Sequence, residues 1–566
     1  MSKDATKAEH LSTLHLRDHP QVADRTFFMD ASSRGLTAIP PEILARQELE
    51  ELHLEDNQIE ELPPDIRHLQ HITTLYLHNN KLRSLCPQLG LLSHLQRLDL
   101  SANSVPAAAL PVLSRLRALR ELRLYHAGLA ELPAVICKSL HHLELLGLTG
   151  NHLRLLPKEV VNLTKLREIY LGQNQFDAFP AELCALEQLH TIDLDENRVA
   201  TIPEEVGHLV ALHKLYVAHN SLPCLPEALG RCGGMSVLDV SHNLLRGVPH
   251  GLAELAEMTE VGLSGNRLEK VPRLLCRWPS LHLLYLSDAG LRRLRGSFRR
   301  LVNLRFLDLS RNLLDHCPRQ LCALRKLEVL ALDDNRIGQL PSELCSLSKL
   351  KILGLSGNEF LSFPEEVFSL ESLEKLYIGQ DQGAKLTCVP ENIAKLQSLK
   401  ELYMENNYLE TLPAALGSMP HLEVLDCRHN LLKVLPDAIC QAQALKELLL
   451  DDNLLTHLPE DLDYLVNLKV LTLSENPMEE PPKDVCAQGR EAVWDFLKEN
   501  RILKIQTTKI QAWWRGMMVR RGFGRFEELL KARKKGKISP KDKKAKQQAA
   551  KEREKEKEKP EKKKKK

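Results

Sequence analysis

The sequence has few aromatic residues and no long apolar run. Phe, Tyr and Trp make up only 4% of the 566 residues, so another residue type must fill the core. No stretch of 18 or more apolar residues occurs, which argues against a transmembrane helix. The first ten residues, MSKDATKAEH, lack the apolar segment of a signal peptide. We therefore expect a cytoplasmic protein whose 13 cysteines are reduced thiols rather than a disulfide framework.

Sequence patterns of catalytic sites are also missing. The chain contains no G-x-x-x-x-G-K-[ST], no G-x-G-x-x-G after a strand, no H-E-x-x-H and no G-x-S-x-G. The carboxylates of Asp193, Asp195 and Glu196 fall inside a repeated pattern, where solvated strand ends are the simpler interpretation. His141 and His142 have no partner at the spacing of metal ligands. The sequence thus predicts no enzyme, no catalytic or metal-binding residue and no cofactor.

The near balance of 77 Lys and Arg against 75 Asp and Glu hides two oppositely charged regions. Residues 531–566 hold 19 basic and 6 acidic side chains, and residues 498–530 hold 8 and 3, which leaves a net charge of −16 on residues 1–497. The basic end is almost free of apolar residues, so we expect it to be disordered. It either binds an acidic surface such as tubulin, RNA or anionic lipid, acts as a nuclear-import signal, or only keeps the chain in solution.

One pattern recurs along most of the chain with a period of 23 residues. It reads L-E-E-L-H-L-E-D-N-Q-I-E-E-L-P at 49–63 and L-R-E-I-Y-L-G-Q-N-Q-F-D-A-F-P at 166–180. The shared frame, L-x-x-L-x-L-x-x-N-x-L-x-x-L-P, resembles the leucine-rich repeat, and about 20 copies run from about residue 27 to 482. The asparagine of the frame is present at Asn57, Asn80, Asn103, Asn151, Asn174, Asn197, Asn220, Asn243, Asn266, Asn312, Asn335, Asn358, Asn407, Asn430, Asn453 and Asn476, and is replaced at Arg34, Ala127 and Ala289.

The period and frame are similar to the cytoplasmic Ras-suppressor and Scribble class of these repeats. The resemblance implies an α/β solenoid curved like a horseshoe, with a parallel sheet on its concave side and short helical or 3₁₀ segments on its convex side. The L-x-L core has the period of a strand, so Leu52 and Leu54 are expected to point inward and His53 outward. The resemblance also implies that each asparagine amide bonds the backbone of its own turn and of the next repeat.

The residue between the two strand leucines is expected to line the concave face. Six of the nine tyrosines occupy this position, and aspartate occupies it in five further repeats. Tyrosine offers a rigid contact surface with a polar tip, which suits protein recognition, although it is also a good strand former. An exposed sheet of this size favours binding of a still unidentified protein. The candidate partner-binding residues are Tyr76, Asp99, Tyr170, Asp193, Tyr216, Asp239, Tyr285, Asp308, Tyr377 and Tyr403.

One insertion interrupts the regular period. The step from Asn358 to Asn407 is 49 residues, three more than two regular repeats, and the extra length falls in residues 378–385. Insertions in solenoids often mark a binding face. A tolerated loop beside the strand is the simpler interpretation.

A different motif follows the repeats, I-Q-A-W-W-R-G-M-M-V-R-R-G-F at residues 510–523. It is similar to the IQ motif at all six specified positions, which implies binding of calmodulin or a related EF-hand light chain. Independently of that resemblance, a basic amphipathic helix is typical of calmodulin targets and of membrane-surface helices. The alternative is a helix packed on the end of the solenoid by its tryptophan face. The candidate calmodulin-binding residues are Ile510, Gln511, Trp514, Arg515, Gly516, Arg520 and Phe523.

These patterns together predict a non-catalytic scaffold or adaptor. Its concave face would bind a protein and its IQ helix calmodulin. A regulator of a small GTPase or phosphatase and a cytoskeletal or ciliary structural protein are the alternatives. The expected segments are an N-terminal segment or cap at 1–26, the solenoid at 27–482, a capping helix at 483–501, the IQ-motif helix at 502–530 and a disordered Lys-rich tail at 531–566.

Overall fold

The structure is a computed structural model that describes residues 27–521. The predicted N-terminal cap, Phe523 of the IQ motif and the Lys-rich tail lie outside the described residues. Within residues 27–521, no helix combines the length and the apolar character that a membrane span requires.

The described chain divides into two compact units. The first comprises residues 27–456 and 465–477. The second comprises residues 457–464 and the chain from 478 onward. The repeat strands belong to the first unit and the IQ motif to the second.

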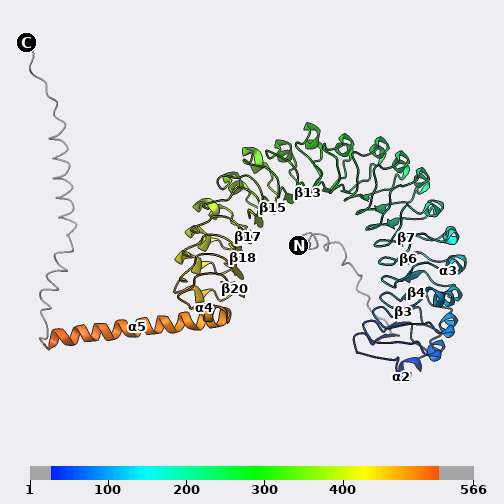
Figure 1. Cartoon of the computed structure of the whole chain (residues 1–566), viewed down its shortest axis with the longest axis horizontal. Helices are drawn as coiled ribbons and strands as arrows, with labels where there is room; N and C mark the ends of the chain where they lie inside the picture. The colour runs from blue at the N-terminus through cyan, green and yellow to red at the C-terminus, as the bar shows by residue number, and fades with distance from the viewer. Residues whose placement is uncertain (1–26, 522–566) are drawn as a thin grey trace, which may run out of the picture. The chain divides into compact units, whose positions relative to one another are not determined.

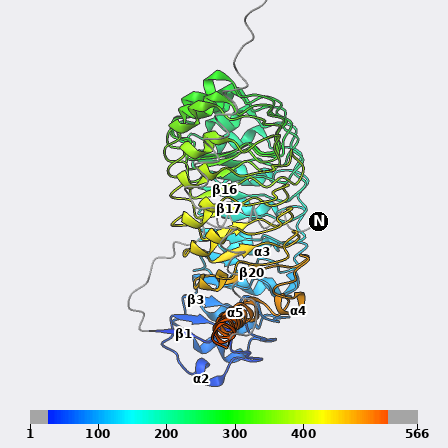
Figure 2. The same cartoon turned by 90° about the vertical axis from the view of Figure 1, so that its left-hand side faces the viewer.

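The first unit is built on one parallel sheet of 20 strands. Each strand is three residues long and pairs in register with the next strand along the chain, as Leu52 does with Leu75 and Leu471 with Leu448. Figure 1 shows the strands on the concave side of this unit, and Figure 2 shows successive repeats stacked one on another. The predicted solenoid is therefore confirmed. The strands are β1 (Phe28–Asp30), β2 (Glu51–His53), β3 (Thr74–Tyr76), β4 (Arg97–Asp99), β5 (Glu121–Arg123), β6 (Leu145–Gly147), β7 (Glu168–Tyr170), β8 (Thr191–Asp193), β9 (Lys214–Tyr216), β10 (Val237–Asp239), β11 (Glu260–Gly262), β12 (Leu283–Tyr285), β13 (Phe306–Asp308), β14 (Val329–Ala331), β15 (Ile352–Gly354), β16 (Lys375–Tyr377), β17 (Glu401–Tyr403), β18 (Val424–Asp426), β19 (Glu447–Leu449) and β20 (Val470–Thr472).

The convex side consists mainly of short 3₁₀ segments. Most follow a proline, as the segment at Ala181–Ala185 follows Pro180. Proline suits this place because its fixed φ and missing N–H fit the start of a helix. The segments are α2 (Pro41–Leu44), η2 (Pro64–His68), η3 (Pro87–Leu91), η4 (Ala107–Arg115), α3 (Ala134–Ser139), η5 (Lys158–Asn162), η6 (Ala181–Ala185), η7 (Glu204–His208), η8 (Glu227–Arg231), η9 (His250–Glu254), η10 (Arg273–Arg277), η11 (Gly296–Arg300), η12 (Arg319–Ala323), η13 (Ser342–Ser346), η14 (Glu365–Ser369), η15 (Glu391–Lys395), η16 (Ala414–Ser418) and η17 (Asp437–Gln441).

Leucines fill the space between the sheet and the convex segments. Leu52 and Leu54 are fully buried and His53 is half-buried, as the alternation in the strand predicts. The asparagines form a ladder, but it runs in the opposite direction from the one expected. Asn174 donates to the carbonyl oxygen of Leu171 in its own turn at 3.0 Å, and to that of Leu148 in the preceding repeat at 2.9 Å. The expectation that the amide reaches the next repeat is therefore wrong.

The insertion leaves the sheet intact. Strand β16 stays in register on both sides, with Leu376 opposite Leu353 and Leu402. Gln380 turns inward, is fully buried, and accepts a hydrogen bond from the backbone N–H of Asn358 at 3.0 Å. This conformation of the insertion requires glycine at position 383, because a Cβ there would lie 1.9 Å from the carbonyl oxygen of Asn358. The extra residues thus pack back onto the solenoid.

The second unit contains η18 (Leu462–Tyr464), α4 (Lys483–Cys486) and α5 (Arg490–Arg520). Helix α5 is 31 residues long and runs without a break from the predicted capping segment into the IQ motif. Its first two turns bury Val493, Trp494 and Leu497.

Candidate functional site

The second half of α5 carries an exposed apolar surface. Among the described residues of this helix, six large apolar side chains from position 502 onward are each at least half exposed. Ile510 is 64% exposed and Trp514 53%, and positions 503, 510 and 514 share one face because they lie seven and four residues apart. The six side chains are Ile502, Leu503, Ile505, Ile510, Trp513 and Trp514.

Trp513 was missed by the motif, although it is 59% exposed. The IQ pattern specifies neither tryptophan, and only Trp514 was picked out from the sequence by its size. Helical geometry at 100° per residue places Trp513 between Ile505 and Trp514 on the helix surface. A helical projection of the sequence would therefore have identified Trp513.

The polar positions of the motif make only local contacts. Gln511 accepts a long hydrogen bond of 3.5 Å from Arg515, and Arg520 Nε donates to the carbonyl oxygen of Gly516 at 3.1 Å. A Cβ on Gly516 would meet only the mobile end of Arg520, at 3.5 Å. Glycine inside a helix is less stable than alanine by about 1 kcal/mol. The fold of the described chain therefore gives no reason for glycine at this position.

Two basic side chains of α5 bind the segment before it in the second unit, and we name these contacts the α5 clamp. Arg501 donates to the carbonyl oxygen of Glu460 at 2.6 Å and to the Tyr464 hydroxyl at 3.1 Å, and it pairs with the buried carboxylate of Asp463. Its guanidinium lies 4.6 Å from the centroid of the Tyr464 ring. Lys504 Nζ lies 2.5 Å from a carboxylate oxygen of Glu460. The clamp fixes α5 two turns before the IQ motif.

The sheet places the concave candidates at one register position, in groups that Arg123, Gly147, Gly262, Ala331 and Gly354 separate. Tyr170, Asp193, Tyr216 and Asp239 are direct register partners on four successive strands, so tyrosine and aspartate alternate along the face. Further along, Tyr285 pairs with Asp308, and Tyr377 with Tyr403, whose rings stack at 4.6 Å. Tyr76 pairs with Asp99 near the first strands.

These concave side chains are less exposed than the sequence led us to expect. All ten are half-buried except Asp99, which is buried. Strands about 4.8 Å apart bring neighbouring side chains into contact, so each covers part of the next. Tyr170 donates its hydroxyl to Glu168 at 2.7 Å and Tyr403 donates to Glu401 at 3.0 Å. Burial raises the pKa of Tyr216 to about 12, with nearby carboxylates adding to the effect.

Asp193 and Asp195 are half-buried and not the solvated strand ends that we expected, whereas Glu196 is exposed. Burial, with the charges of Asp193 and Asp239, raises the pKa of Asp195 to about 8. Asp195 accepts a hydrogen bond from the backbone N–H of Ala218 at 2.6 Å, and Asp193 accepts one from the N–H of Asp195 at 2.9 Å. Asp195 therefore keeps its proton near pH 7, and a basic group bound beside it would favour the charged carboxylate.

Tyr125 is a second residue that the pattern missed. It follows the second strand leucine of its repeat, two residues after the column position at Arg123, and its ring centroid lies 6.4 Å from that of Tyr170. Burial raises the pKa of Tyr125 to about 12. Outward residues occur on both sides of that leucine, so a search of both columns would have found it.

Comparison with known families follows the same division of the chain. A model described as leucine-rich repeat region matches residues 263–405, and one described as leucine rich repeats (2 copies) matches residues 47–90. Two models described as leucine rich repeat match residues 420–478 and 398–419. A model described as the IQ calmodulin-binding motif matches residues 502–524. The fold and the motif therefore define a leucine-rich-repeat protein with a C-terminal IQ helix.

Curated relatives narrow this class. A Homo sapiens protein named Leucine-rich repeat and IQ domain-containing protein 4 is 79% identical over 543 residues, covering 96% of this chain and 97% of that protein. The Mus musculus protein of the same name is 78% identical over 550 residues, covering 97% and 92%. The chain belongs to the leucine-rich repeat and IQ domain-containing protein 4 family, which its combination of repeats and motif resembles.

Among solved structures, the solenoid is similar to the Arabidopsis receptor kinase HAESA in complex with the peptide hormone IDA and the co-receptor SERK1. The TM-score is 0.55 at 25% identity, covering 80% of this chain and 82% of that chain. The repeats and the IQ motif together support a protein-interaction scaffold, and the motif supports a partner of the calmodulin type. The family names point to protein binding rather than catalysis.

Proposed function

We propose that this protein is a scaffold that holds calmodulin, or a related EF-hand protein, on α5 and a protein partner with basic side chains on its concave sheet. The exposed apolar face of α5 carries the proposal. EF-hand proteins open a Met-rich apolar groove that accepts the apolar face of a basic helix. Ile510, Trp513 and Trp514 supply that face, and Arg515 and Arg520 supply the positive charge.

The residues of the motif divide this work by position. Ile510 and Trp514 enter the apolar groove, and Trp514 is the largest single contributor because tryptophans dominate binding energy at interfaces. Gln511 bonds the partner's backbone, and Arg515 and Arg520 pair with its acidic groups. Gly516 lets the partner approach the helix backbone. Phe523 would extend the apolar contact beyond the described residues.

The α5 clamp gives the bound partner a fixed place within the second unit. Arg501 and Lys504 hold the helix at the end of the 483–501 segment, and the IQ-motif helix, proposed as 502–530, begins there. A continuous helix rises 1.5 Å per residue, so the position of Trp514 relative to the clamp is set by the backbone.

The concave column fits a partner that presents lysine or arginine. Its tyrosines offer aromatic faces and its half-buried aspartates offer charge, which together suit basic side chains. The similar solenoid of HAESA is described in complex with a peptide hormone, which supports binding of a polypeptide. None of the 13 cysteines, all of which lie within residues 27–521, forms a disulfide bond, and we place the protein in the cytoplasm, where thiols stay reduced.

Calorimetric titration of the full chain with calmodulin, with calcium and with a chelator, tests the first half of the proposal. We expect binding in at least one condition. Ile510→Ala with Trp514→Ala should weaken it at least about 30-fold, because each removes an apolar anchor. Leu361→Ala is the matched control, since Leu361 is 87% exposed in the solenoid and outside α5. Absence of binding in both conditions would remove calmodulin from the proposal.

Proximity labelling in cells tests the second half. The chain with Tyr216→Ala, Asp239→Ala and Tyr285→Ala should lose one or more proteins that the unchanged chain labels, while calmodulin labelling persists. An identical set of labelled proteins would contradict partner binding on the concave face.

A further inference from the structure

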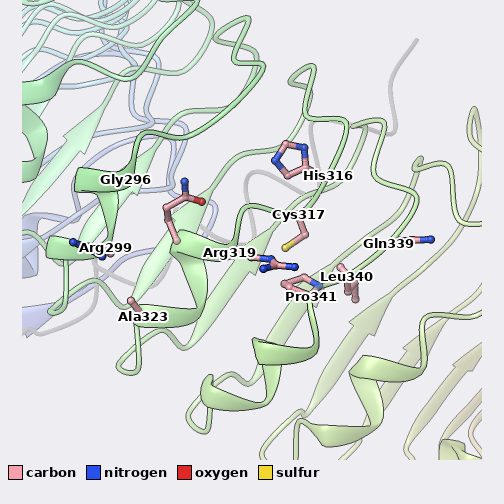
Figure 3. Close-up of a pocket in the computed structure, with 10 residues that line it drawn as sticks. Gly296, Arg299, His316, Cys317, Arg319, Ala323, Gln339, Leu340 and Pro341 are labelled. Carbon is pink, nitrogen blue, oxygen red and sulfur yellow. The ribbon is translucent and has the colours of Figure 1, made fainter.

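A cleft opens on the convex side of the solenoid, between η11, η12 and the turn before η13. Its volume is about 660 Å³. Figure 3 shows Gly296 and Arg299 on one turn and Arg319 on the next, with His316 on the connecting loop. The remaining polar lining comes from Gln320 and Gln339. We name this site the arginine cleft.

One wall of the cleft carries no side chain. Gly296 is the first residue of η11, the position that Glu204, Glu227 and Glu391 occupy in η7, η8 and η15. A Cβ on Gly296 would meet nothing within 4 Å. A side chain would therefore fit here without disturbing the fold, and the space is open to a side chain from elsewhere.

The charge around the cleft is opposite to that of the solenoid as a whole. Residues 271–324 contain ten arginines, no lysine and three aspartates, whereas residues 1–497 carry a net charge of −16. Five of these arginines lie on three successive convex segments. They are Arg273, Arg277, Arg299, Arg300 and Arg319.

Most of these guanidinium groups have no charged partner. Among residues 27–521, no carboxylate pairs with the four arginines of η10 and η11. Arg319 lies 3.9 Å from Glu343, but its side chain is 80% exposed, and an ion pair of that kind contributes about 0–1 kcal/mol. Arg299 and Arg319 line the arginine cleft itself, and Arg273, Arg277 and Arg300 add positive charge on the same run of convex segments.

We propose that the arginine cleft binds a Glu- and Asp-rich segment of a partner protein, separately from α5 and the concave sheet. The planar arginine fork matches a carboxylate with two parallel hydrogen bonds, and the absence of lysine favours this geometry over diffuse attraction. Two nearby arginines already pair with carboxylates one repeat further on. Arg305 lies 3.9 Å from Glu328, and Arg311 lies 3.6 Å from Asp334.

Other polyanions fit this surface less well. Single-stranded nucleic acid needs exposed aromatic rings for stacking, but Trp278 and Phe298 are buried. Stable attachment to a membrane needs apolar groups that insert, and Val302 is the only large apolar residue exposed within 271–324. An acidic polypeptide requires neither feature.

Fluorescence anisotropy of a labelled peptide of about ten glutamates, with the full chain, tests the proposal. Gly296→Glu fills the cleft with the side chain that other repeats carry, and it should weaken binding roughly tenfold without loss of folding. Arg299→Glu with Arg319→Glu should do the same. Arg67→Glu is the matched control, because Arg67 is the fourth residue of η2 as Arg299 is of η11, and it should change binding less than about twofold.

The Lys-rich end of the chain will also attract this peptide, so the contact must be located. A photoreactive group on the peptide, followed by mass spectrometry, should mark residues within 292–320. Marking of residues 522–566 alone would overturn the proposal, as would equal binding by Gly296→Glu and the unchanged chain. Loss of binding to anionic vesicles or single-stranded RNA in Gly296→Glu, with peptide binding unaffected, would overturn it as well.

Discussion

Trp278 of the solenoid and the two tryptophans of the IQ motif have opposite surroundings. Trp278 in the solenoid is buried to 2% exposure, and its Nε1 donates to the carbonyl oxygen of Leu252 in the preceding repeat at 3.1 Å. Trp513 and Trp514 on α5 are more than half exposed and make no hydrogen bond to any described residue. Stacked repeats use their apolar and polar groups on one another. The large apolar groups of α5 beyond the clamp stay at least half exposed among the described residues.

Gly383 in the solenoid and Gly516 in α5 also differ in their surroundings. Gly383 is required by the fold, because the carbonyl oxygen of Asn358 occupies the place of its Cβ. Among the described residues, Gly516 has only the end of the Arg520 side chain near the place of its Cβ. A glycine that the solenoid needs and a glycine that the helix does not need should respond to substitution in opposite ways.

The largest expected effect comes from exchanging the tryptophans for alanine. Trp278→Ala should lower the free energy of unfolding by about 3–5 kcal/mol, because it leaves a cavity and removes the hydrogen bond from Trp278 to Leu252. Trp513→Ala should change it by less than about 0.5 kcal/mol and should weaken calmodulin binding instead. Urea unfolding and calorimetric titration of both variants check this. Equal loss of stability in the two variants would show that α5 is packed like the repeats.

Substitution of Gly383 should have the next largest effect. Gly383→Ala forces the insertion away from Asn358 and should cost about 1–3 kcal/mol. Because solenoid stability is local, hydrogen exchange should rise in β15 to β17 and remain unchanged in β2 to β4. Gly296→Ala is the control, since its Cβ would meet no atom within 4 Å. An unaltered exchange pattern in Gly383→Ala would mean that the insertion is a free loop.

The pH dependence of stability should reveal the raised pKa of Asp195 on the concave face. Its pKa of about 8 lies well above the usual value near 3.9, so the folded chain keeps a proton that the unfolded chain releases. Stability should therefore fall as pH rises from about 4 to about 8. Asp195→Asn removes this dependence and should be more stable than the unchanged chain by at least about 1 kcal/mol at pH 8, with little difference at pH 4. Urea unfolding of both chains at both pH values measures this. A difference in the free energy of unfolding that does not change with pH would contradict the raised pKa of Asp195.

The smallest effect is expected at Gly516. Gly516→Ala should raise the helicity of α5 and stabilise it by about 0.5–1 kcal/mol. Its added methyl group should weaken calmodulin binding a few-fold, because the partner meets the helix backbone there. Circular dichroism and titration of the variant measure the two changes. Stronger binding by the alanine variant would contradict the proposed close approach.

The sequence predicts the solenoid well because the repeat frame is local and recurs. Leucines at fixed spacing can only be buried by stacking, and Leu52, Leu54 and their equivalents are buried in that way. The length of the insertion does not predict which of its residues turns inward, so the buried hydrogen bond of Gln380 could be found only in the structure. Partial covering of Asp193 and Tyr216 by adjacent strands is likewise a three-dimensional effect. Net charge summed over residues 1–497 concealed the arginine cleft, which a count by repeat reveals.

Hydrogen exchange of the full chain, measured with and without saturating calmodulin, tests the contrast between the two units most directly. Without calmodulin, the strands should exchange slowly and residues 502–521 quickly. On addition of calmodulin, protection should rise in 502–521 and remain unchanged in the strands. Slow exchange of 502–521 in the free protein, with no response to calmodulin, would contradict our conclusion that α5 holds its apolar face for a partner.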